Sequence, residues 1–406
     1  MIYLTILAAF AALSFIYDYR QKESGRLFCW IVMLVVLICV SGFRYHVGMD
    51  SILYEWYFEN ELHTLGDLKL ADFQATRFAV LYVLLTSACK TITPDFMLVQ
   101  FVVSITVNCT IFWFIWKNTR HVYFAGFLYF FVLYILLNTE VLREAMAVSV
   151  FLWSWPLFKR KKWLAYYALA FVAFNFHLSA MVLFLLPLLR TKAIGWFFEL
   201  DRRTFIILPF VLLLGVACFY FLFDFIQLVS MSETLNDRVN MYSHDRLSRG
   251  QLNFVDIAMS IVRLALYPLV ALYFLKKNRK RWEEDEDNVL MERMVMLFVY
   301  FVMLSQGMVI FYRYYHYFQI FAFVTMANWT YSVLHFKRKL IRLNFVYWWL
   351  LFVPMFATQW VGYYNRKVNK SGSMRTYEIY YPYSNQFDQE IDPQRQRVIN
   401  YNLNML

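Results

Sequence analysis

Two polar side chains lie at the turns of otherwise apolar hairpins, and both have the chemistry of a substrate site. Arg143 lies at the start of the apolar segment 141–158, and His177 follows the apolar segment 163–175. The basic run 159–162 separates the two segments, and four charges are too costly to place in lipid. This run predicts a cytoplasmic turn, so Arg143 and His177 face the opposite side together. A charged residue near the bilayer boundary is by default a functional candidate.

A second polar group follows the apolar segment 27–43. Arg44 comes directly after this segment, at the depth of the lipid head groups, where a planar guanidinium suits a phosphate. Asp50 lies six residues further on and could accept a proton from a hydroxyl nucleophile, with Tyr54 one helical turn beyond it. Two structural roles stay open: an arginine that reaches to the interface, and an aspartate that caps a helix beginning near Ile52.

Two more arginines are candidates for substrate binding. Arg313 lies in the aromatic stretch 311–317, which is typical of the aromatic belt at a membrane interface. Arg263 lies in the middle of the apolar segment 254–275, where a charge is expensive in lipid and is expected to face the interior of a bundle. Structural roles also stay open for Arg143 and His177. His177 could be a buried core residue, and Arg143 could form an ion pair with a neighbouring glutamate.

The elements that position these residues are apolar helices. The chain has 406 residues, of which 61% are hydrophobic and 21% aromatic, and this composition predicts an all-α, polytopic membrane protein. The formal net charge of +11 comes from short basic clusters between apolar segments, a pattern that indicates loop topology and not nucleic-acid binding. All five cysteines lie inside apolar segments without metal-ligand spacing.

The order of apolar segments predicts the topology. They cover 1–17, 27–43, 77–92, 96–116, 122–138, 141–158, 163–175, 177–190, 204–226, 254–275, 290–309, 314–334 and 343–362. If every segment crossed the bilayer, the basic loop 18–26 and the run 159–162 would face opposite sides. We therefore interpret 77–92 as a juxtamembrane or re-entrant helix on the outer face, which leaves about 12 transmembrane helices.

This topology gives one membrane domain over residues 1–362, with outer loops at 44–76 and 228–252. The first segment has no basic leader or small-residue cleavage site, so it is expected to be a retained helix. The tail 363–406 is too polar to span and is rich in tyrosine, so we expect it to fold back over the outer face. The outer face then holds most of the candidate residues.

Several common catalytic motifs are absent from the sequence. It has no P-loop, no GxGxxG, no HExxH, no GxSxG and no cluster of metal ligands, so neither a cofactor nor a metal is expected. What remains is a group of arginines with a carboxylate and a histidine at head-group depth. Arginines bind phosphate and diphosphate well, and a lipid-linked phosphorylated substrate could enter this site sideways from the bilayer.

Three motifs together resemble the EpsG family of Wzy-like polymerases, which make bacterial exopolysaccharide, capsule and O-antigen. They are Phe43-Arg44-Tyr45-His46-Val47-Gly48-Met49-Asp50 followed by Tyr54, Leu142-Arg143 with Ala145 and Ala147, and Phe176-His177-Leu178-Ser179-Ala180. The resemblance covers roughly residues 1 to 365 and is clearest over 40–190. It is compatible with a GT-C-like architecture.

The resemblance implies an enzyme of the bacterial inner membrane whose active site faces the periplasm or the cell exterior. Its substrate would be an undecaprenyl-diphosphate-linked oligosaccharide, and a flippase and a chain-length regulator would be its partners. Arg44, Arg143 and Arg313 would hold the diphosphate, and Asp50 or His177 would activate or orient the acceptor hydroxyl. Two alternatives stay open: a membrane glycosyltransferase that uses a polyprenyl-phosphate sugar, and a transporter of lipid-linked glycans.

Overall fold

The computed structural model describes residues 2–75, 78–204, 206–215, 254–278, 286–306, 309–334, 357, 364, 368 and 373–403. Within these ranges every named element is a helix, and an isolated bridge of extended backbone joins Arg44 to Asn385. The predicted all-α class is therefore confirmed. The chain divides into two compact units, Met1–Phe184 with Gln359–Leu406, and Leu185–Thr358.

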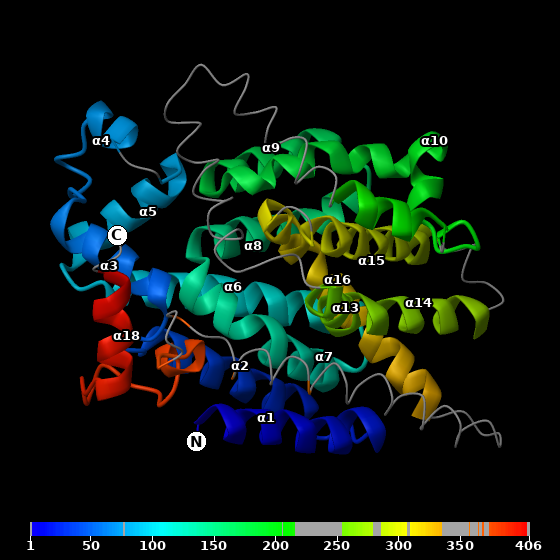
Figure 1. Ribbon diagram of the computed structural model, residues 1–406, viewed down its shortest axis with the longest axis horizontal. Helices are drawn as coiled ribbons and strands as arrows, with labels where there is room; N and C mark the ends of the chain where they lie inside the picture. The colour runs from blue at the N-terminus through cyan, green and yellow to red at the C-terminus, as the bar shows by residue number, and fades with distance from the viewer. Residues whose placement is uncertain are drawn as a thin grey trace. The chain divides into compact units, whose positions relative to one another are not determined.

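The long helices of the first unit lie side by side (Figure 1). They are α1 (Ile2–Leu13) continued by η1 (Ser14–Tyr19), α2 (Arg26–Gly42), α6 (Met97–Asn118), α7 (Val122–Tyr129) with η2 (Phe130–Tyr134) and η3 (Leu136–Glu140), α8 (Leu142–Lys159) and α9 (Trp163–Phe176). Helix α6 packs between α2 and α8, and α9 covers α8. Stacked aromatic rings fill the core, as where Trp30 of α2 meets Phe112 of α6 at 4.1 Å between ring centroids.

The predicted hairpin between α8 and α9 is present. Helix α8 ends at Lys159, the turn passes through Lys161 in the left-handed region at φ +58°, and α9 begins at Trp163. The two helices pack along each other in antiparallel directions. Arg143 near the start of α8 and His177 just after α9 therefore lie at the same end of the hairpin, which agrees with the prediction from the basic run.

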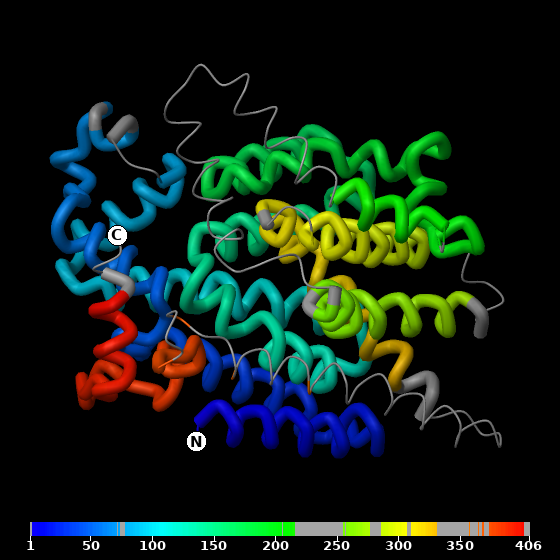
Figure 2. Tube along the Cα trace, in the orientation of Figure 1, coloured from blue at the N-terminus to red at the C-terminus, as the bar shows by residue number. Residues whose placement is uncertain are grey.

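Shorter helices gather at one end of this unit (Figures 1 and 2). They are α3 (Met49–Asn60), α4 (Leu70–Ala75), α5 (Val80–Ile92), η9 (Thr376–Ile379) and α18 (Pro393–Leu403). Helix α5 has 13 residues, fewer than the roughly 20 that a spanning helix needs. Its placement on the outer face remains a prediction.

The second unit is organised around α15 (Glu286–Ser305) and α16 (Tyr312–Leu334). Its other elements are the 3₁₀ helix η4 (Leu178–Arg190), which begins in the first unit, α10 (Lys192–Gly195), η5 (Trp196–Phe198), the helix Ile206–Gly215, α13 (Phe254–Ile261), η6 (Val262–Leu266), α14 (Tyr267–Asn278) and η8 (Val309–Phe311). Helix α16 packs against both α14 and α15.

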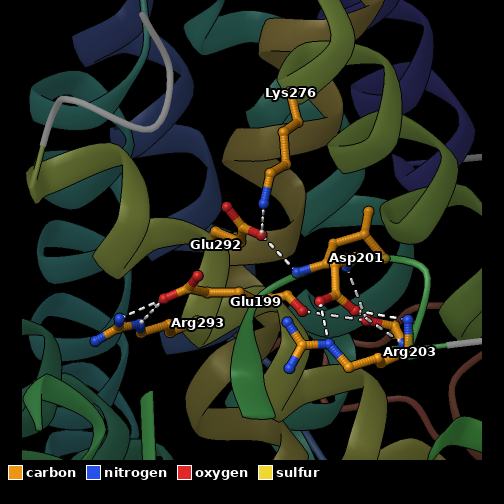
Figure 3. A network of polar contacts seen from close by, with 8 residues as sticks. Glu199, Asp201, Arg203, Lys276, Glu292 and Arg293 are labelled. Atoms are coloured by element: carbon orange, nitrogen blue, oxygen red, sulfur yellow. Dashed lines mark hydrogen bonds and ion pairs between the residues drawn. The ribbon is translucent and has the colours of Figure 1, made fainter. Parts of the chain in front are cut away.

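Ion pairs tie the segment after η4 to α15 (Figure 3). Glu292 is 1% exposed, and its carboxylate accepts hydrogen bonds from the ammonium of Lys276 at 3.0 Å and the backbone N–H of Leu200 at 2.5 Å. The next residue, Arg293, pairs with Glu199. A buried charge of this kind is stable only when it is paired. Here two consecutive residues of α15, Glu292 and Arg293, are both held by ion pairs. Glu199 and Lys276 belong to loops predicted to be cytoplasmic. Glu292 and Arg293 lie at the start of the predicted apolar segment 290–309.

Four helical stretches in the described ranges are long and apolar enough to cross a membrane: Ile2–Tyr19, Met97–Asn118, Ile257–Lys276 and Glu286–Ser305. The pair Leu178–Arg190 and Lys192–Phe198, bent by 105°, would make a fifth. The protein is thus an all-helical membrane protein. The predicted loop 228–252 lies outside the described residues, as does all but residue 357 of the predicted segment 343–362.

Candidate active site

Helix α3 is fixed at its N-terminus by the carboxylate of Glu140. One oxygen accepts the backbone N–H of Met49 and the other that of Asp50, both at 2.9 Å. The first N–H groups of a helix have no partner within it, and the helix dipole favours a negative charge there. Gly48 permits this approach, because its φ is +99° and a Cβ would lie 2.7 Å from the Cβ of Thr139.

The other end of α3 is capped by the opposite charge. The ammonium of Lys90, from α5, donates hydrogen bonds to the carbonyls of Phe58 at 2.5 Å, Glu59 at 3.1 Å and Leu62 at 2.8 Å. The last carbonyls of a helix lack partners and attract a cation. Helix α3 is therefore held at both ends by charges that complement its dipole, and it forms a rigid support for the side chains it carries.

Arg44 is buried against α3, with 1% of its surface exposed. Its guanidinium donates to the carbonyl of Ser41 and, at 3.0 Å, to the hydroxyl of Ser51 on α3. Within the described part of the chain, its Nε has no hydrogen-bond partner. Burial lowers the pKa of Arg44 to about 10, so the group still carries its charge at neutral pH. One donor of a charged, buried side chain thus remains available for an acidic ligand.

Arg143 approaches the same helix from α8. Its Nε donates to the hydroxyl of Tyr54 at 3.3 Å. The guanidinium carbon lies 5.6 Å from the centroid of the Tyr54 ring and 4.6 Å from that of Phe78, within the range of cation–π attraction. Tyr54 is 6% exposed and packs against Tyr82 of α5 at 5.5 Å between centroids. The rings of Tyr54 on α3 and of Phe78, just before α5, therefore position the Arg143 guanidinium.

The two arginines reach α3 at neighbouring positions. Ser51 and Tyr54 are three residues apart on one helix, so they share a face, with their Cβ atoms about 5 to 6 Å apart. Tyr82 packs against Tyr54, and its hydroxyl is buried and has no hydrogen-bond partner among the described residues. Burial raises the pKa of Tyr82, while Arg143 and Arg44 both act in the opposite direction. Two positive charges therefore act on one buried hydroxyl.

The C-terminal tail completes this group by covering the loop that precedes α3. Tyr45 N–H donates to the carbonyl of Ser384 at 3.0 Å, and Gln386 N–H donates to that of Phe43 at 2.9 Å. The hydroxyl of Tyr380 donates to Glu140, the carboxylate that caps α3. An apolar cluster joins the loop to the tail, formed by Val47, Ile379, Tyr380 and Val398.

Within the tail, the side chain of Arg395 holds separate segments together by hydrogen bonds. Its side chain is fully buried and donates to the hydroxyl of Ser384 at 2.8 Å and to the carbonyl of Glu378 at 3.4 Å. It thereby links α18 to the segment that contacts the loop. Described residues of the predicted tail 363–406 thus contact residues 43–47, and the side of the membrane on which the tail lies stays a prediction.

Asp50 and His177, the two predicted acid–base residues, have different surroundings. Asp50 is exposed in the first turn of α3, whose N-cap is Gly48, so the capping role considered for Asp50 belongs to Glu140. His177 accepts the N–H of Ser179 on its Nδ1 at 3.2 Å, and the hydroxyl of Ser179 lies 2.5 Å from the same atom. A ring nitrogen that accepts an N–H carries no proton, which leaves the proton of neutral His177 on Nε2.

Arg263 and Arg313 belong to the second unit, so their place in the substrate site remains a prediction. Arg313 lies in the first turn of α16, with its guanidinium carbon 5.5 Å from the centroid of the Tyr312 ring. Arg263 lies in η6, in the middle of the apolar stretch Ile257–Lys276. In the described ranges, no group of three or more His, Cys, Asp or Glu side chains could hold a metal ion.

Sequence reasoning missed Ser51, Tyr82, Glu140 as a cap, and the contribution of the tail. Ser51 directly follows Asp50 and could have been noticed as a polar residue one turn before Glu55. Tyr82 carries no signal in the sequence, since it is one of 30 tyrosines and stands in an apolar run.

Comparisons with known proteins identify the family. A family model described as the EpsG family matches residues 27–385, a range that contains both arginines that contact α3 and the hairpin of α8 and α9. No curated protein and no solved structure matches the chain. The match covers most of the chain and agrees with the motifs at Arg44, Arg143 and His177. This protein belongs to the EpsG family.

Proposed function

We propose that this protein is a Wzy-like polysaccharide polymerase. It joins oligosaccharide repeat units linked to undecaprenyl diphosphate at the outer face of the bacterial inner membrane. Membership of the EpsG family supports a role as an exopolysaccharide-related polymerase. The proposal rests on one observation: Arg44 and Arg143 donate hydrogen bonds to residues that are neighbours on α3. Two guanidinium groups held in this way suit a diphosphate.

In this reaction the growing chain moves from its lipid carrier to a hydroxyl of the next lipid-linked unit. A bond forms between the acceptor oxygen and the anomeric carbon, and the bond from that carbon to the diphosphate breaks. The electron pair leaves with the diphosphate, so negative charge develops there in the transition state. Arg44 and Arg143 stabilise this charge, and Tyr54 holds Arg143 in place.

The remaining predicted residues have secondary places in the proposal. Arg313 and Arg263 stay candidates for substrate binding from the sequence alone. Asp50 and His177 would orient the acceptor sugar. His177 fits this task as a donor, since its Nδ1 already accepts a backbone N–H. The chemistry requires neither a nucleotide nor a cofactor.

The topology belongs to the proposal as well. We propose about 12 transmembrane helices and a GT-C-like architecture, with α3, α5 and the tail 363–406 on the outer face. A flippase would supply the lipid-linked units and a chain-length regulator would set the polymer size. Capsule or O-antigen would be made by the same chemistry from a different repeat unit.

A glycan ladder tests the proposal and separates it from the two alternatives. Cells that lack the protein would be complemented with the wild type, Arg143→Ala or Arg143→Lys, and the glycans resolved on a gel. We expect a ladder with the wild type and single lipid-linked units with Arg143→Ala. Addition of one sugar per step would indicate a glycosyltransferase that uses a polyprenyl-phosphate sugar. An unchanged ladder in the strain that lacks the protein would overturn the polymerase and favour a transporter.

A further inference from the structure

A carboxylate and an imidazole lie together beside Arg44, on residues to which the sequence analysis gave no role. The Nε2 atom of His46 is 3.8 Å from the Oε2 atom of Glu55. Their side chains are 27% and 16% exposed, so both are largely buried yet still reachable from outside. The pair joins the loop before α3 to the second turn of that helix.

Glu55 lies on the part of α3 that faces the Arg44 guanidinium. It is four residues after Ser51, whose hydroxyl accepts a hydrogen bond from Arg44, and residues four apart are neighbours on one helix face. Asp50 is five residues before Glu55, which rotates it about 140° around the helix axis. Glu55 is therefore closer to the direction of Arg44 than Asp50 is, on a helix whose two ends are both capped.

The backbone at His46 is held in an unusual conformation. Its φ is +48°, in the left-handed region that a residue with a Cβ rarely adopts. Such a conformation persists only where the surroundings impose it, and it occurs preferentially at functional sites. Here the surroundings are the tail, which hydrogen-bonds the preceding residue Tyr45 through Ser384. The loop thus presents the His46 ring to Glu55 at a cost in backbone strain.

We propose that Glu55 is the general base of the polymerase and that His46 is the positioning residue that orients it. This inference rests on the proposed function. The carboxylate of Glu55 takes the proton from the acceptor hydroxyl as that oxygen bonds to the anomeric carbon. The bond between this carbon and the diphosphate breaks, and the diphosphate leaves with the electron pair beside Arg44. The proton on Glu55 then passes to water before the next cycle.

The charges around the pair suit a base that works near neutral pH. Burial raises the pKa of Glu55 to about 7; the charge of Glu59 adds to this rise, Arg44 opposes it, and Asp95 adds to it. Burial and the charge of Arg395 both lower the pKa of His46, so this ring is neutral at pH 7. A base with a pKa near the working pH combines a large ionised fraction with a useful affinity for the proton.

The pH profile of the purified full-length protein tests the proposal. Polymerisation of lipid-linked repeat units would be measured from mildly acidic to mildly alkaline pH for the wild type, Glu55→Gln and His46→Gln. Glu61→Gln, an exposed carboxylate just after α3, is the matched control. We expect the wild-type rate to fall as the pH drops below about 7, because Glu55 takes up a proton.

Glu55→Gln should lower kcat by about 10²- to 10⁴-fold and abolish the acidic limb of the profile. Glu55→Asp, which shortens the carboxylate, should keep that limb at a lower kcat. His46→Gln should shift the limb while leaving the KM for the lipid-linked unit unchanged, which a loss of folding would not do. Thermal unfolding of each variant shows whether it is folded.

The outcomes separate this inference from the function on which it rests. Loss of activity in Arg143→Ala together with a Glu55→Gln rate within about threefold of the wild type would overturn the base and keep the polymerase. A wild-type protein that forms no polymer from lipid-linked units would overturn both. A profile in which His46→Gln leaves the acidic limb in place would overturn the positioning role.

Discussion

Glu140 and Tyr380, 240 residues apart in the sequence, meet in a hydrogen bond at the start of helix α3. The Tyr380 hydroxyl donates to a carboxylate that already accepts two backbone N–H groups of the helix. The C-terminal tail is thereby coupled to the helix that carries the contacts of both Arg44 and Arg143. The tail therefore acts on the candidate active site as part of its support.

Tyr380→Phe should destabilise the protein by about 1 to 3 kcal/mol, since it removes a hydrogen bond to a charged acceptor. It should also lower polymerisation by loosening the start of α3. Thermal unfolding in detergent measures the first effect. Tyr381→Phe is the matched control, because Tyr381 is 47% exposed and should tolerate the same change. Equal melting temperatures for the two variants would contradict the coupling.

Gly48→Ala should destabilise the protein by more than about 1 kcal/mol. The φ of +99° disfavours any side chain there, and the added Cβ would meet Thr139 at 2.7 Å. Gly66→Ala is the control, since nothing lies within 4 Å of a Cβ at that position. The comparison is made by thermal unfolding, and a Gly48→Ala protein as stable as Gly66→Ala would show that α3 begins in another way.

Tyr82→Phe separates substrate binding from folding. Its hydroxyl is buried without a hydrogen-bond partner in the described ranges, so removing it should leave stability unchanged or raise it by about 1 kcal/mol. If the hydroxyl binds the diphosphate, the KM for the lipid-linked unit should rise by about tenfold. Steady-state kinetics and thermal unfolding on the same preparation check both. A less stable variant with an unchanged KM would refute the assignment.

The buried Glu55 carboxylate predicts how stability changes with pH. Its pKa rises on folding from 4.5 to about 7, so the folded state binds more protons than the unfolded state between these values. The stability that this group contributes is therefore present at low pH and lost as the pH rises through about 7. Glu55→Gln should gain melting temperature relative to the wild type above pH 7 but not near pH 5. A constant difference across this range would contradict the prediction.

Local sequence patterns were sufficient for the apolar helices of the described ranges and for the hairpin. They did not predict α3, which lies within the segment 44–76 that was expected to be a loop. The basic run 159–162 is a charge cluster that no bilayer interior accepts, so it marks the turn and brings Arg143 and His177 to one end. The apolar stretches also predicted most helix boundaries within a few residues. The number of membrane crossings could not be predicted in the same way. Helices as short as α9 cannot be recognised as membrane-spanning from their length.

The partners of the candidate residues could not be predicted, since they come from distant parts of the chain. Tyr54 meets Arg143 across 89 residues, and Glu140 caps α3 across 91. Neither contact leaves a periodic pattern in the sequence. His46 and Glu55 are close in the sequence, so their contact is local. Its significance depends on burial and on the charge of Arg44, and the spacing of residues in the sequence shows neither.

The central claim is that Arg44 and Arg143 act together on one diphosphate. The most direct measurement is the release of undecaprenyl diphosphate by the purified wild type, Arg44→Ala, Arg143→Ala and the double variant. Each single substitution should lower kcat/KM by about 10²-fold or more, and the double variant should lose much less than the product of the two effects. Single variants within about threefold of the wild type, or fully additive losses, would contradict a shared diphosphate site.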